Sequence, residues 1–269
     1  MKAIKVGIVG CGGRMGRMLV AEVSATKGLA LAGGTEQALS PLIGQDVAAQ
    51  AGLEPAGIKV GADPAALFKV SDAVVDFTTP KATLAHARLA AKTGKALIVG
   101  TTGLDKDHLA ALRTAAKKAV VVQAANMSVG VNVLLGLTER VARMLGPDYD
   151  IEIVEMHHRM KVDAPSGTAL ALGSAAAAGR GVDLAKVAQR VRDGITGPRR
   201  TGDIGFATLR GGDVAGDHTV VFAGDGERVE LVHKASSRAV FAKGAIRAVK
   251  WTRGKKPGFF TMRNVLGFD

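Results

Sequence analysis

The sequence predicts an α/β protein that consists of a doubly wound parallel sheet and a second α+β domain. Three observations lead to this prediction. Short apolar runs alternate with helical stretches through the first half of the chain, the order of elements changes after about residue 126, and helical patterning returns near the C-terminus. Strand, helix and strand in this order indicate parallel strands joined by right-handed crossovers. The length of 269 residues, 47% of them hydrophobic, suffices for one large domain or two ordinary ones.

The elements of the first half follow from local patterns. Residues 4–9 form an apolar run typical of a buried strand. Residues 14–26 then place Met15, Leu19 and Val23 at helical spacing, and Gly28 ends that helix. Further strands are expected at 29–32, 58–60, 73–77, 96–99 and 119–122, and further helices at 82–93 and 106–118.

The second half predicts an α+β arrangement. It begins with a long helix at 131–145, a strand at 150–156 and a helix from about Thr168, followed by a loop rich in Gly and Arg at 193–205. Extended runs are expected at 206–210, 218–223 and 228–233. Turn residues at 224–227 predict a hairpin between the last two runs. Helical patterning at 237–251 predicts a segment that packs back on the first domain.

The charge of the chain favours small anions as ligands. There are 36 Lys and Arg against 24 Asp and Glu, a formal net charge of +12. The excess basic residues are not concentrated in a tail or stripe, and only 4% of residues are aromatic. We therefore expect no nucleic acid as partner. No apolar run approaches the ~20 residues of a membrane span, and the first residues make too short a run for a secretory signal. We expect a soluble, cytoplasmic protein without a membrane partner.

A glycine loop follows the first predicted strand and opens the next helix. Gly10, Gly13 and Gly16 have the spacing Gly-x-x-Gly-x-x-Gly, whereas Met15 breaks the pattern Gly-x-Gly-x-x-Gly. Backbone N–H groups and the helix dipole at such a loop can hold a pyrophosphate, which favours a Rossmann-like dinucleotide-binding domain. A tight turn that only permits close helix packing is the alternative.

Two further features support a dinucleotide site. Glu36 lies 20 residues after Gly16, where a carboxylate can accept hydrogen bonds from ribose hydroxyls, although a solvated loop Glu would look the same. Gln37 follows it, and residues 33–41 contain no Arg or Lys for a 2′-phosphate, which favours NADH over NADPH unless Arg14 compensates. The segment 100–103, Gly-Thr-Thr-Gly, follows the end of a later strand. It can be a loop that binds the ligand, or an ordinary polar turn.

Neither the single cysteine nor the histidines predict a second kind of chemistry. Cys11 is the single cysteine, so the chain cannot form an intrachain disulfide. Its place near a helix N-terminus can lower a thiol pKa, but the sequence suggests no catalytic partner, so a nucleophilic role is not expected. We expect no metal, because the four histidines of the second half lack a recognisable zinc spacing: His157, His158, His218 and His233.

A basic cluster in the second domain predicts an anion site. Four side chains that can be cationic lie within five residues, at 157–161, and repel one another unless they are solvated or meet an anion. The segment Pro165–Thr168 then begins an Ala-rich helix whose first N–H groups form a second anion receptor. The two features can hold two carboxylates of one small molecule, and His and Lys provide acid chemistry. A solvated basic loop is the alternative.

These motifs together resemble the 4-hydroxy-tetrahydrodipicolinate reductase family, also called dihydrodipicolinate reductases, of diaminopimelate and lysine biosynthesis. The resemblance spans nearly the whole chain and rests on the segments 10–16, 100–103, 124–132, 155–168 and 233–238. It implies that residues 1–127, rejoined by 238–269, bind the dinucleotide. Residues 128–237 would then bind the substrate, a cyclic imine dicarboxylate, and form the contacts of a homotetramer.

The resemblance also implies roles for individual residues. His157 and Lys161 would be the catalytic pair, with Lys161 as the proton donor. His158, Gly167 and Thr168 would contact the substrate. The cofactor contacts would come from Gly10, Cys11, Gly12, Gly13, Arg14, Met15, Glu36, Gly100, Thr101, Thr102, Ala124, Ala125, Asn126 and Met127.

Two positions depart from the family pattern. Gln37 stands where many relatives have Arg, and Met127 replaces an aromatic residue common near the nicotinamide. We therefore expect either NADH or NADPH to serve, with NADH at least comparable. Two rival functions stay open: another two-domain NAD(P)-dependent dehydrogenase of an amino-acid pathway, and a non-catalytic module that senses dinucleotides or binds nucleic acid.

Overall fold

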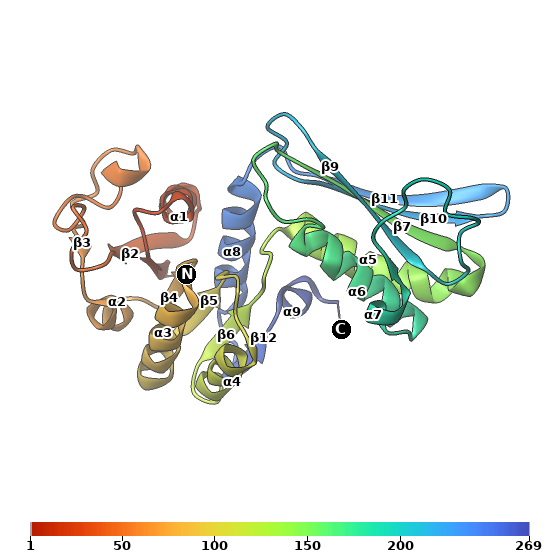
Figure 1. Cartoon of the computed structure of the whole chain (residues 1–269). Coiled ribbons are helices and arrows are strands. Elements are labelled where there is room, and N and C mark those ends of the chain that lie inside the picture. Colours follow the sequence, from red (N-terminus) through yellow and green to blue (C-terminus); the bar gives the residue numbers. More distant parts are fainter. Residues whose placement is uncertain (1, 269) are drawn as a thin grey trace. The chain divides into compact units, whose positions relative to one another are not determined.

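The computed structural model describes residues 2–268 and divides into two compact units (Figure 1). The first unit comprises the chain up to Val129 together with the residues from Ala239 onward, and the second is Gly130–Arg238. The predicted fold class, a doubly wound parallel sheet with a second α+β unit, is confirmed. No helix within residues 2–268 has the length and apolar character needed to cross a membrane.

The first unit is built on a seven-stranded parallel sheet. Its order is β12-β6-β5-β4-β1-β2-β3, and each neighbouring pair is parallel. The strands are β1 Ile4–Val9, β2 Leu29–Thr35, β3 Val60–Gly61, β4 Ala73–Asp76, β5 Ala96–Val99, β6 Val120–Gln123 and β12 Gly258–Phe260. Because the chain winds outward from β1 in one direction and from β4 in the other, the order reverses between these strands, and open sheets bind ligands beyond the carboxyl ends there.

Helices cover both faces of this sheet. One face packs against α1 Arg14–Ala25, α8 Ala239–Trp251 and α9 Met262–Leu266, and the other packs against α2 Pro64–Val70, α3 Pro80–Thr93 and α4 Lys106–Ala115. Successive strand residues point alternately into the cores on the two faces of the sheet. In β5, Ile98 points into the core on the α1 face, and Leu97 and Val99 point into the core on the α3 face. The helix predicted at 237–251 is α8, and it contacts α1 as expected.

Several elements of the first unit differ from the prediction. Strand β2 continues to Thr35, although Gly33 and Gly34 are poor strand formers, because parallel pairing with β1 extends that far. The pattern at 58–60 yields only the two residues of β3. The elements that were not predicted include α2, whose start is capped by Asp63, and the short β12 and α9. Their brevity gives little periodicity to detect.

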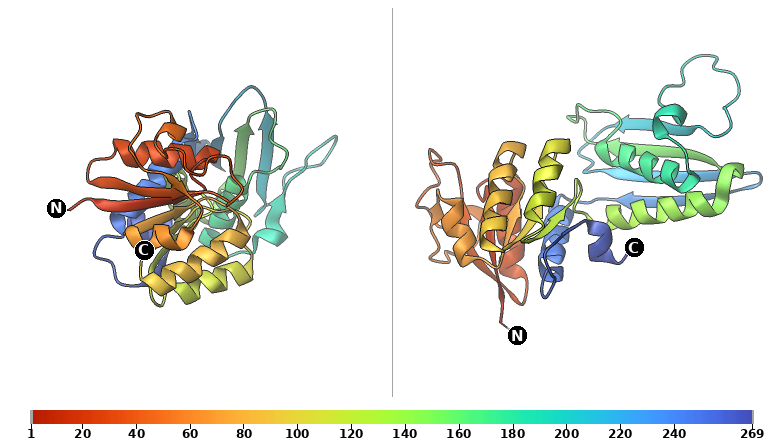
Figure 2. Two further views of the ribbon diagram at one scale, coloured as in Figure 1. Left: turned by 90° about the vertical axis from the view of Figure 1, so that its left-hand side faces the viewer. Right: turned by 90° about the horizontal axis from the view of Figure 1, so that it is seen from below.

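The second unit has a five-stranded mixed sheet with helices on one face. Its order is β11-β10-β7-β9-β8, in which β7 pairs with β10 in antiparallel and with β9 in parallel orientation. The strands are β7 Asp150–His157, β8 Ala188–Gln189, β9 Ile204–Arg210, β10 Asp217–Gly224 and β11 Glu227–Lys234. The helices are α5 Val129–Leu145, α6 Gly167–Arg180 and the short α7 Leu184–Val187. The two views in Figure 2 show both sheets with their helices.

The core of the second unit lies between its sheet and helices α5 and α6. Leu134 and Leu172 from the helices pack with Ile151, Ile153 and Phe222 from the strands. The predicted hairpin is confirmed, since β10 and β11 are antiparallel and Gly224 pairs with Glu227 across the turn. Packing in this core therefore fixes the positions of strands β7, β9 and β10, and the ends of these strands carry charged residues.

Candidate active site

A pocket of about 590 Å³ lies at the carboxyl edge of the parallel sheet in the first unit. Its lining includes Gly10, Gly12, Gly13 and Glu36, together with Gln37. These residues follow β1 and β2, and further lining comes from the segment after β4. The glycine loop and Glu36 thus lie at one pocket, as a dinucleotide site requires.

The glycine loop is shaped by close approaches of backbone. Gly10 has φ +68, and a Cβ there would lie 2.8 Å from Thr78 Cγ2. At Gly16 a Cβ would overlap the Gly10 carbonyl oxygen, so only glycine lets α1 close upon the loop. Helix α1 then starts after Gly13 without a side-chain cap, unlike α3 and α4. Its first N–H groups are available to an anion, which fits a pyrophosphate.

Glu36 already contacts the loop. Its Oε1 accepts a hydrogen bond of 2.7 Å from the Gly12 backbone N–H. A Cβ at Gly12 would come within 3.2 Å of the same oxygen, so the absence of a side chain permits this bond. The carboxylate is therefore held beside the glycine loop, and its remaining lone pairs can accept further hydrogen bonds.

Cys11 is not a reactive thiol. It is 1% exposed and packs against Gly34 of β2. Burial, together with the nearby charge of Glu36, raises the pKa of Cys11 to about 11. A lowered pKa, which its place near a helix N-terminus would favour, is wrong, because burial outweighs the backbone hydrogen bonds that lower the pKa. The thiol stays protonated at neutral pH and serves packing.

Several of the other predicted cofactor residues have no exposed side chain. Gly100 lies under the Phe77 ring, which a Cβ at Gly100 would overlap. Thr101 is 3% exposed and faces the Asp76 carboxylate, whereas Thr102 is exposed. Met127 is 1% exposed in the core of the first unit. Thr101 and Met127 therefore present almost no surface to solvent in this structure.

The remaining predicted cofactor residues flank the same edge. Arg14 is exposed at the start of α1, while Met15 is half-buried against the core. Ala124 and Ala125 follow β6, and Asn126 Oδ1 accepts a bond of 2.8 Å from Ser128 N. Their position after a strand end agrees with a ligand loop.

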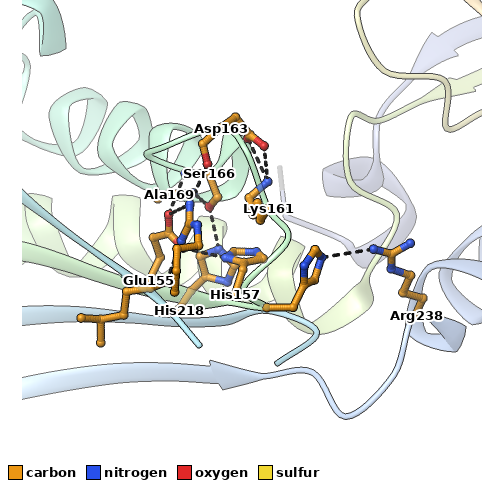
Figure 3. Close-up of polar contacts among 11 residues, drawn as sticks. Glu155, His157, Lys161, Asp163, Ser166, Ala169, His218 and Arg238 are labelled. Carbon is orange, nitrogen blue, oxygen red and sulfur yellow. Dashed lines mark hydrogen bonds and ion pairs between the residues drawn. The ribbon is translucent and has the colours of Figure 1, made fainter. Parts of the chain in front are cut away.

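In the second unit, strand register gathers four ionisable residues at one end of the mixed sheet. Glu155 pairs with His218 across β7 and β10, and His157 pairs with Arg210 across β7 and β9. Glu155 and His157 lie on the same face of β7 because they are two residues apart. The result is a compact cluster formed from three strands (Figure 3).

Glu155 is the centre of this cluster. It is 1% exposed, and Arg210 donates to both of its oxygens, over 2.8 and 3.0 Å. Ser166 N donates to Oε1 over 3.0 Å, and His157 Nδ1 lies 2.6 Å from Oε2. Burial alone raises the pKa of Glu155, but the bonds from Arg210 and His157 outweigh it, so that the pKa lies below the ordinary value. The carboxylate is ionised at neutral pH.

His157 is thereby fixed in tautomer and direction. An ionised carboxylate only accepts hydrogen bonds, so Nδ1 carries the proton that is donated to Glu155. Nε2 is then the nitrogen available for proton exchange, and it faces Gly216, where a Cβ would lie 2.9 Å from it. The ring of His218 packs edge-on against His157, with 5.1 Å between ring centroids.

His218 is held neutral. It is 3% exposed, and its Nε2 lies 3.0 Å from Ser166 Oγ. Burial, followed by the charge of His157, lowers the pKa of His218 to about 4. The hydroxyl of Ser166 also accepts a bond of 3.1 Å from Ala169 N, as the cap of α6. His218 thus supports the N-terminus of α6 and adds no charge at neutral pH.

Lys161 and His158 lie in the turn that leaves β7. Lys161 Nζ donates to both oxygens of Asp163, over 2.7 and 2.8 Å, and this bond lowers the pKa of Asp163. His158 Nε2 lies 3.4 Å from Arg238 Nη2, and Arg159 is exposed. Figure 3 shows Lys161 and Asp163 facing each other near Ser166. The basic cluster is therefore less repulsive than its sequence indicated, because Glu155 and Asp163 balance two of its members.

The start of α6 is open to a ligand. Ser166 caps the helix, and Gly167, the first helical residue, is exposed with nothing near its missing Cβ. Thr168 follows it and is half-buried. A 14-residue helix places partial positive charge at this point, so a carboxylate is stabilised there.

Sequence reasoning gave no role to Arg210, His218, Asp163 or Glu155. The sequence did contain an indication for Glu155, because alternation along a strand places it on the same face as His157. Arg210 and His218 lie more than 50 residues further along the chain, and only strand register brings them together. Within residues 2–268 no group of three His, Cys, Asp or Glu side chains is arranged to hold a metal ion.

Family models match almost all of the chain. The model described as "Dihydrodipicolinate reductase, N-terminus" matches residues 4–127, and "Dihydrodipicolinate reductase, C-terminus" matches residues 130–266. The chain belongs to the dihydrodipicolinate reductase family. Membership in this family agrees with the resemblance that the motifs carry.

Individual relatives support the same family over the full length. A 4-hydroxy-tetrahydrodipicolinate reductase of Rhodopseudomonas palustris (strain HaA2) is 53% identical over 267 residues, which cover 99% of this chain and 98% of the relative. One of Methylocella silvestris is 52% identical with the same coverage. Among solved structures, a dipicolinate-bound dihydrodipicolinate reductase from Paenisporosarcina sp. TG-14 has a TM-score of 0.78 at 22% identity, covering 96% of this chain and 97% of that chain. At this identity the structural match shows a shared fold.

Proposed function

We propose that this protein reduces 4-hydroxy-tetrahydrodipicolinate to tetrahydrodipicolinate, with NADH or NADPH as the reductant. The observation that carries the proposal is the arrangement of His157 on an ionised, buried Glu155, next to Lys161 and the open start of α6. This cluster combines acid groups with a receptor for carboxylates. The relatives named above are reductases by name and match over nearly their whole length.

The first unit would hold the cofactor. The uncapped start of α1 would receive the pyrophosphate, and Glu36, held by Gly12, would accept bonds from the ribose of the adenosine. A bound nicotinamide dinucleotide supplies the hydride of the reduction. The glycine positions support this fit, because a Cβ at Gly16 would overlap the Gly10 carbonyl oxygen and keep α1 from closing upon the loop.

The second unit would hold the substrate by its two carboxylates. One carboxylate would lie at the start of α6, where Gly167 and Thr168 begin the helix. The other would meet the side chains of His158 and Lys161, which lie in the turn after β7. A dicarboxylate held at two points has a fixed orientation, and orientation is a large part of catalysis.

Proton transfer would be divided between His157 and Lys161. Lys161 keeps one N–H for the substrate beyond the two that face Asp163, since an ammonium group has three donors. The 4-hydroxyl leaves as water, which needs a proton moved from a ring carbon to the leaving oxygen, and His157 Nε2 would carry that proton while Nδ1 stays with Glu155. After hydride addition the electron-rich ring product requires a proton, and Lys161 is the proposed donor.

We also propose that NADH serves at least as well as NADPH. Gln37 lines the pocket beside Glu36, and neither side chain offers a positive charge to a 2′-phosphate. The carboxylate of Glu36 would repel such a phosphate. Arg14, exposed at the start of α1, is the cation that can offset this repulsion.

The organisation of the two units extends this proposal. The unit Gly130–Arg238 would bind substrate and form the contacts of a homotetramer, and the other unit would bind the dinucleotide. The protein would act in the cytoplasm, in the formation of diaminopimelate and lysine. Size-exclusion chromatography with light scattering would contradict the tetramer by finding a monomer.

The decisive experiment is an assay with freshly generated 4-hydroxy-tetrahydrodipicolinate that follows NADH and NADPH consumption in parallel. Consumption that depends on the imine supports the proposal. Turnover of aspartate or homoserine with NAD, and none of the imine, would favour a dehydrogenase of another amino-acid pathway. Steeply salt-dependent DNA or RNA binding without imine reduction would favour a binding module.

A further inference from the structure

The carboxylate of Asp76 accepts hydrogen bonds from four different residues below the dinucleotide pocket. Asp76 ends β4 and is 0% exposed. Its Oδ1 accepts from Thr78 N over 2.9 Å, from Thr78 Oγ1 over 2.6 Å and from Thr101 Oγ1 over 3.2 Å. Its Oδ2 accepts from Thr83 Oγ1 over 2.9 Å and lies 2.8 Å from His86 Nδ1. The acceptor sites of the carboxylate are all engaged.

These donors belong to three segments that follow two neighbouring strands of the sheet. Thr78 lies in the loop after β4, His86 and Thr83 lie in the first turns of α3, and Thr101 lies in the loop after β5. Thr83 Oγ1 and Thr101 Oγ1 also lie 3.0 Å apart, so the Thr83 hydroxyl can donate its proton to Thr101 instead of Asp76. One buried carboxylate therefore connects two ligand loops and a helix.

Two of these segments, the loop after β4 and the start of α3, line the pocket that contains the glycine loop. Phe77, Thr78, Thr79 and His86 belong to its lining, opposite the residues that follow β1 and β2. Burial alone raises the pKa of Asp76, but the bonds from His86 and Thr78 outweigh this, and the pKa is lowered. The carboxylate is ionised, so its bonds are charge-assisted and stronger than neutral ones.

We propose that Asp76 is a positioning residue of the dinucleotide pocket. Its carboxylate holds the loop after β4, the start of α3 and the loop after β5 in one arrangement, and this arrangement sets the affinity for the nicotinamide dinucleotide. The inference rests on the proposed function, because the ligand of the pocket is the proposed cofactor. Asp76 is buried and is absent from the pocket lining, so its effect is transmitted by Thr78 and His86, which line the pocket.

Thr83 provides the sharpest test. The pocket lining, taken over residues 2–268, does not include it, and it is 0% exposed. Thr83→Val keeps the shape of the side chain and removes only its hydroxyl. We expect the dissociation constant for NADH, measured by calorimetric titration, to rise about threefold to tenfold, the range that one lost hydrogen bond covers. Thr83→Ser restores the hydroxyl and should return the dissociation constant to within about twofold of wild type.

Two further variants test whether the change in NADH affinity comes from the hydrogen bonds of Asp76. Asp76→Asn replaces one acceptor oxygen by a donor and should weaken NADH binding by about tenfold or more, because bonds to a charged group are the stronger kind. Thr93→Val is the matched control, since Thr93 lies at the end of the same helix and bonds only locally, to Leu89 O over 2.8 Å. It should bind NADH like wild type.

The outcomes separate this inference from the proposed function. If wild type binds NADH and reduces the imine, but Thr83→Val binds NADH equally well and merely melts at a lower temperature, the network is structural and the inference is wrong. If Thr83→Ser fails to restore binding, the hydroxyl is not the cause and the inference is also wrong. If wild type binds neither NADH nor NADPH, the proposed function fails and the inference fails with it.

Discussion

Glu155 and His157 form a buried pair on one face of β7, with His157 Nδ1 2.6 Å from Glu155 Oε2. The pair is not isolated, because Arg210 neutralises the carboxylate and Ser166 N binds its second oxygen. The same carboxylate thus orients the histidine and secures the start of α6. An acid group and an anion receptor are held in fixed geometry by one side chain.

Replacing Glu155 by Gln should reduce turnover by about 10²-fold, the loss that a misplaced catalytic group can cause. The amide can no longer accept from both Arg210 and His157, so the ring of His157 loses its fixed tautomer. Steady-state kinetics would show the effect mainly in kcat. Glu152→Gln is the control, since Glu152 lies on the same strand and pairs with Arg192 and Arg199 instead. Equal losses in both variants would contradict the assigned role of Glu155.

Lys161→Ala should lower kcat by about 10²–10⁴-fold while the fold is retained, because general acid catalysis contributes factors of this size. Lys161→Arg keeps the charge but has a pKa too high to supply a proton readily, so it should retain substrate affinity better than turnover. The assay follows NADH consumption, and circular dichroism checks the fold. Near-wild-type activity in purified Lys161→Ala would remove this residue from the mechanism.

Gln37→Arg should raise kcat/KM for NADPH by about tenfold or more, since a charge-assisted bond to the 2′-phosphate is worth about 1.5–3 kcal/mol. Gln37 lines the pocket next to Glu36, so the new guanidinium would lie near the ribose. Parallel kinetics with the two cofactors test this, and Gln45→Arg, on the surface near Pro41, serves as control. A large NADPH advantage in wild type would contradict our interpretation of Gln37.

His218 should make the free energy of unfolding depend on pH between about 4 and 6.5. Its pKa is lowered to about 4 in the folded state, from the ordinary value of 6.5. In this interval the unfolded chain binds a proton that the native state does not, so stability falls as the pH falls, by up to about 3 kcal/mol. Above pH 6.5 both states are neutral at this position and the contribution of the shift is constant.

His218→Gln tests this dependence, because glutamine does not titrate. Urea unfolding of the variant at several pH values between 4.5 and 7.5 should give a shallower fall in stability than wild type. His108→Gln is the control: that histidine pairs with Asp105 on the surface of the other unit. An unchanged pH dependence in His218→Gln would show that other groups, such as His233, whose pKa is also lowered by burial, account for the fall.

Gly16→Ala should destabilise the first unit and abolish dinucleotide binding. Its Cβ would overlap the Gly10 carbonyl oxygen, and overpacking of this kind costs about 1–3 kcal/mol or more. Gly61→Ala is the matched control, since the nearest atoms to its Cβ lie 4.0 Å away. Thermal unfolding and NADH titration measure both effects. Wild-type binding by Gly16→Ala would mean that α1 can move away from the loop.

The parts of this protein that sequence could predict are those with a local cause. The glycine loop, Glu36 and the start of α6 were found because strand ends, glycine spacing and helix starts are encoded by neighbouring residues. Glu155 and its partners were missed, since Arg210 and His218 reach it only through strand register. Register depends on which strands pair, and a single sequence does not state this.

Burial explains the other differences. Cys11, Thr101 and Met127 lie in motifs that predict ligand contacts, yet each side chain is at most 3% exposed. Sequence position placed these segments after strand ends but did not indicate which of their residues are buried. The buried network of Asp76 has the same origin, because a polar residue at the end of an apolar strand indicates neither its partners nor its burial.

The return of the chain to the first unit has a consequence for the order of synthesis. Strand β12 extends the parallel sheet beside β6, and Ala245, Val249 and Met262 complete the core on the α1 face. On the ribosome, the amino-terminal strands are made long before these residues, and the whole second unit is made in between. The apolar face that α8 covers therefore stays uncovered during most of translation, and the first unit to be started is the last to be finished.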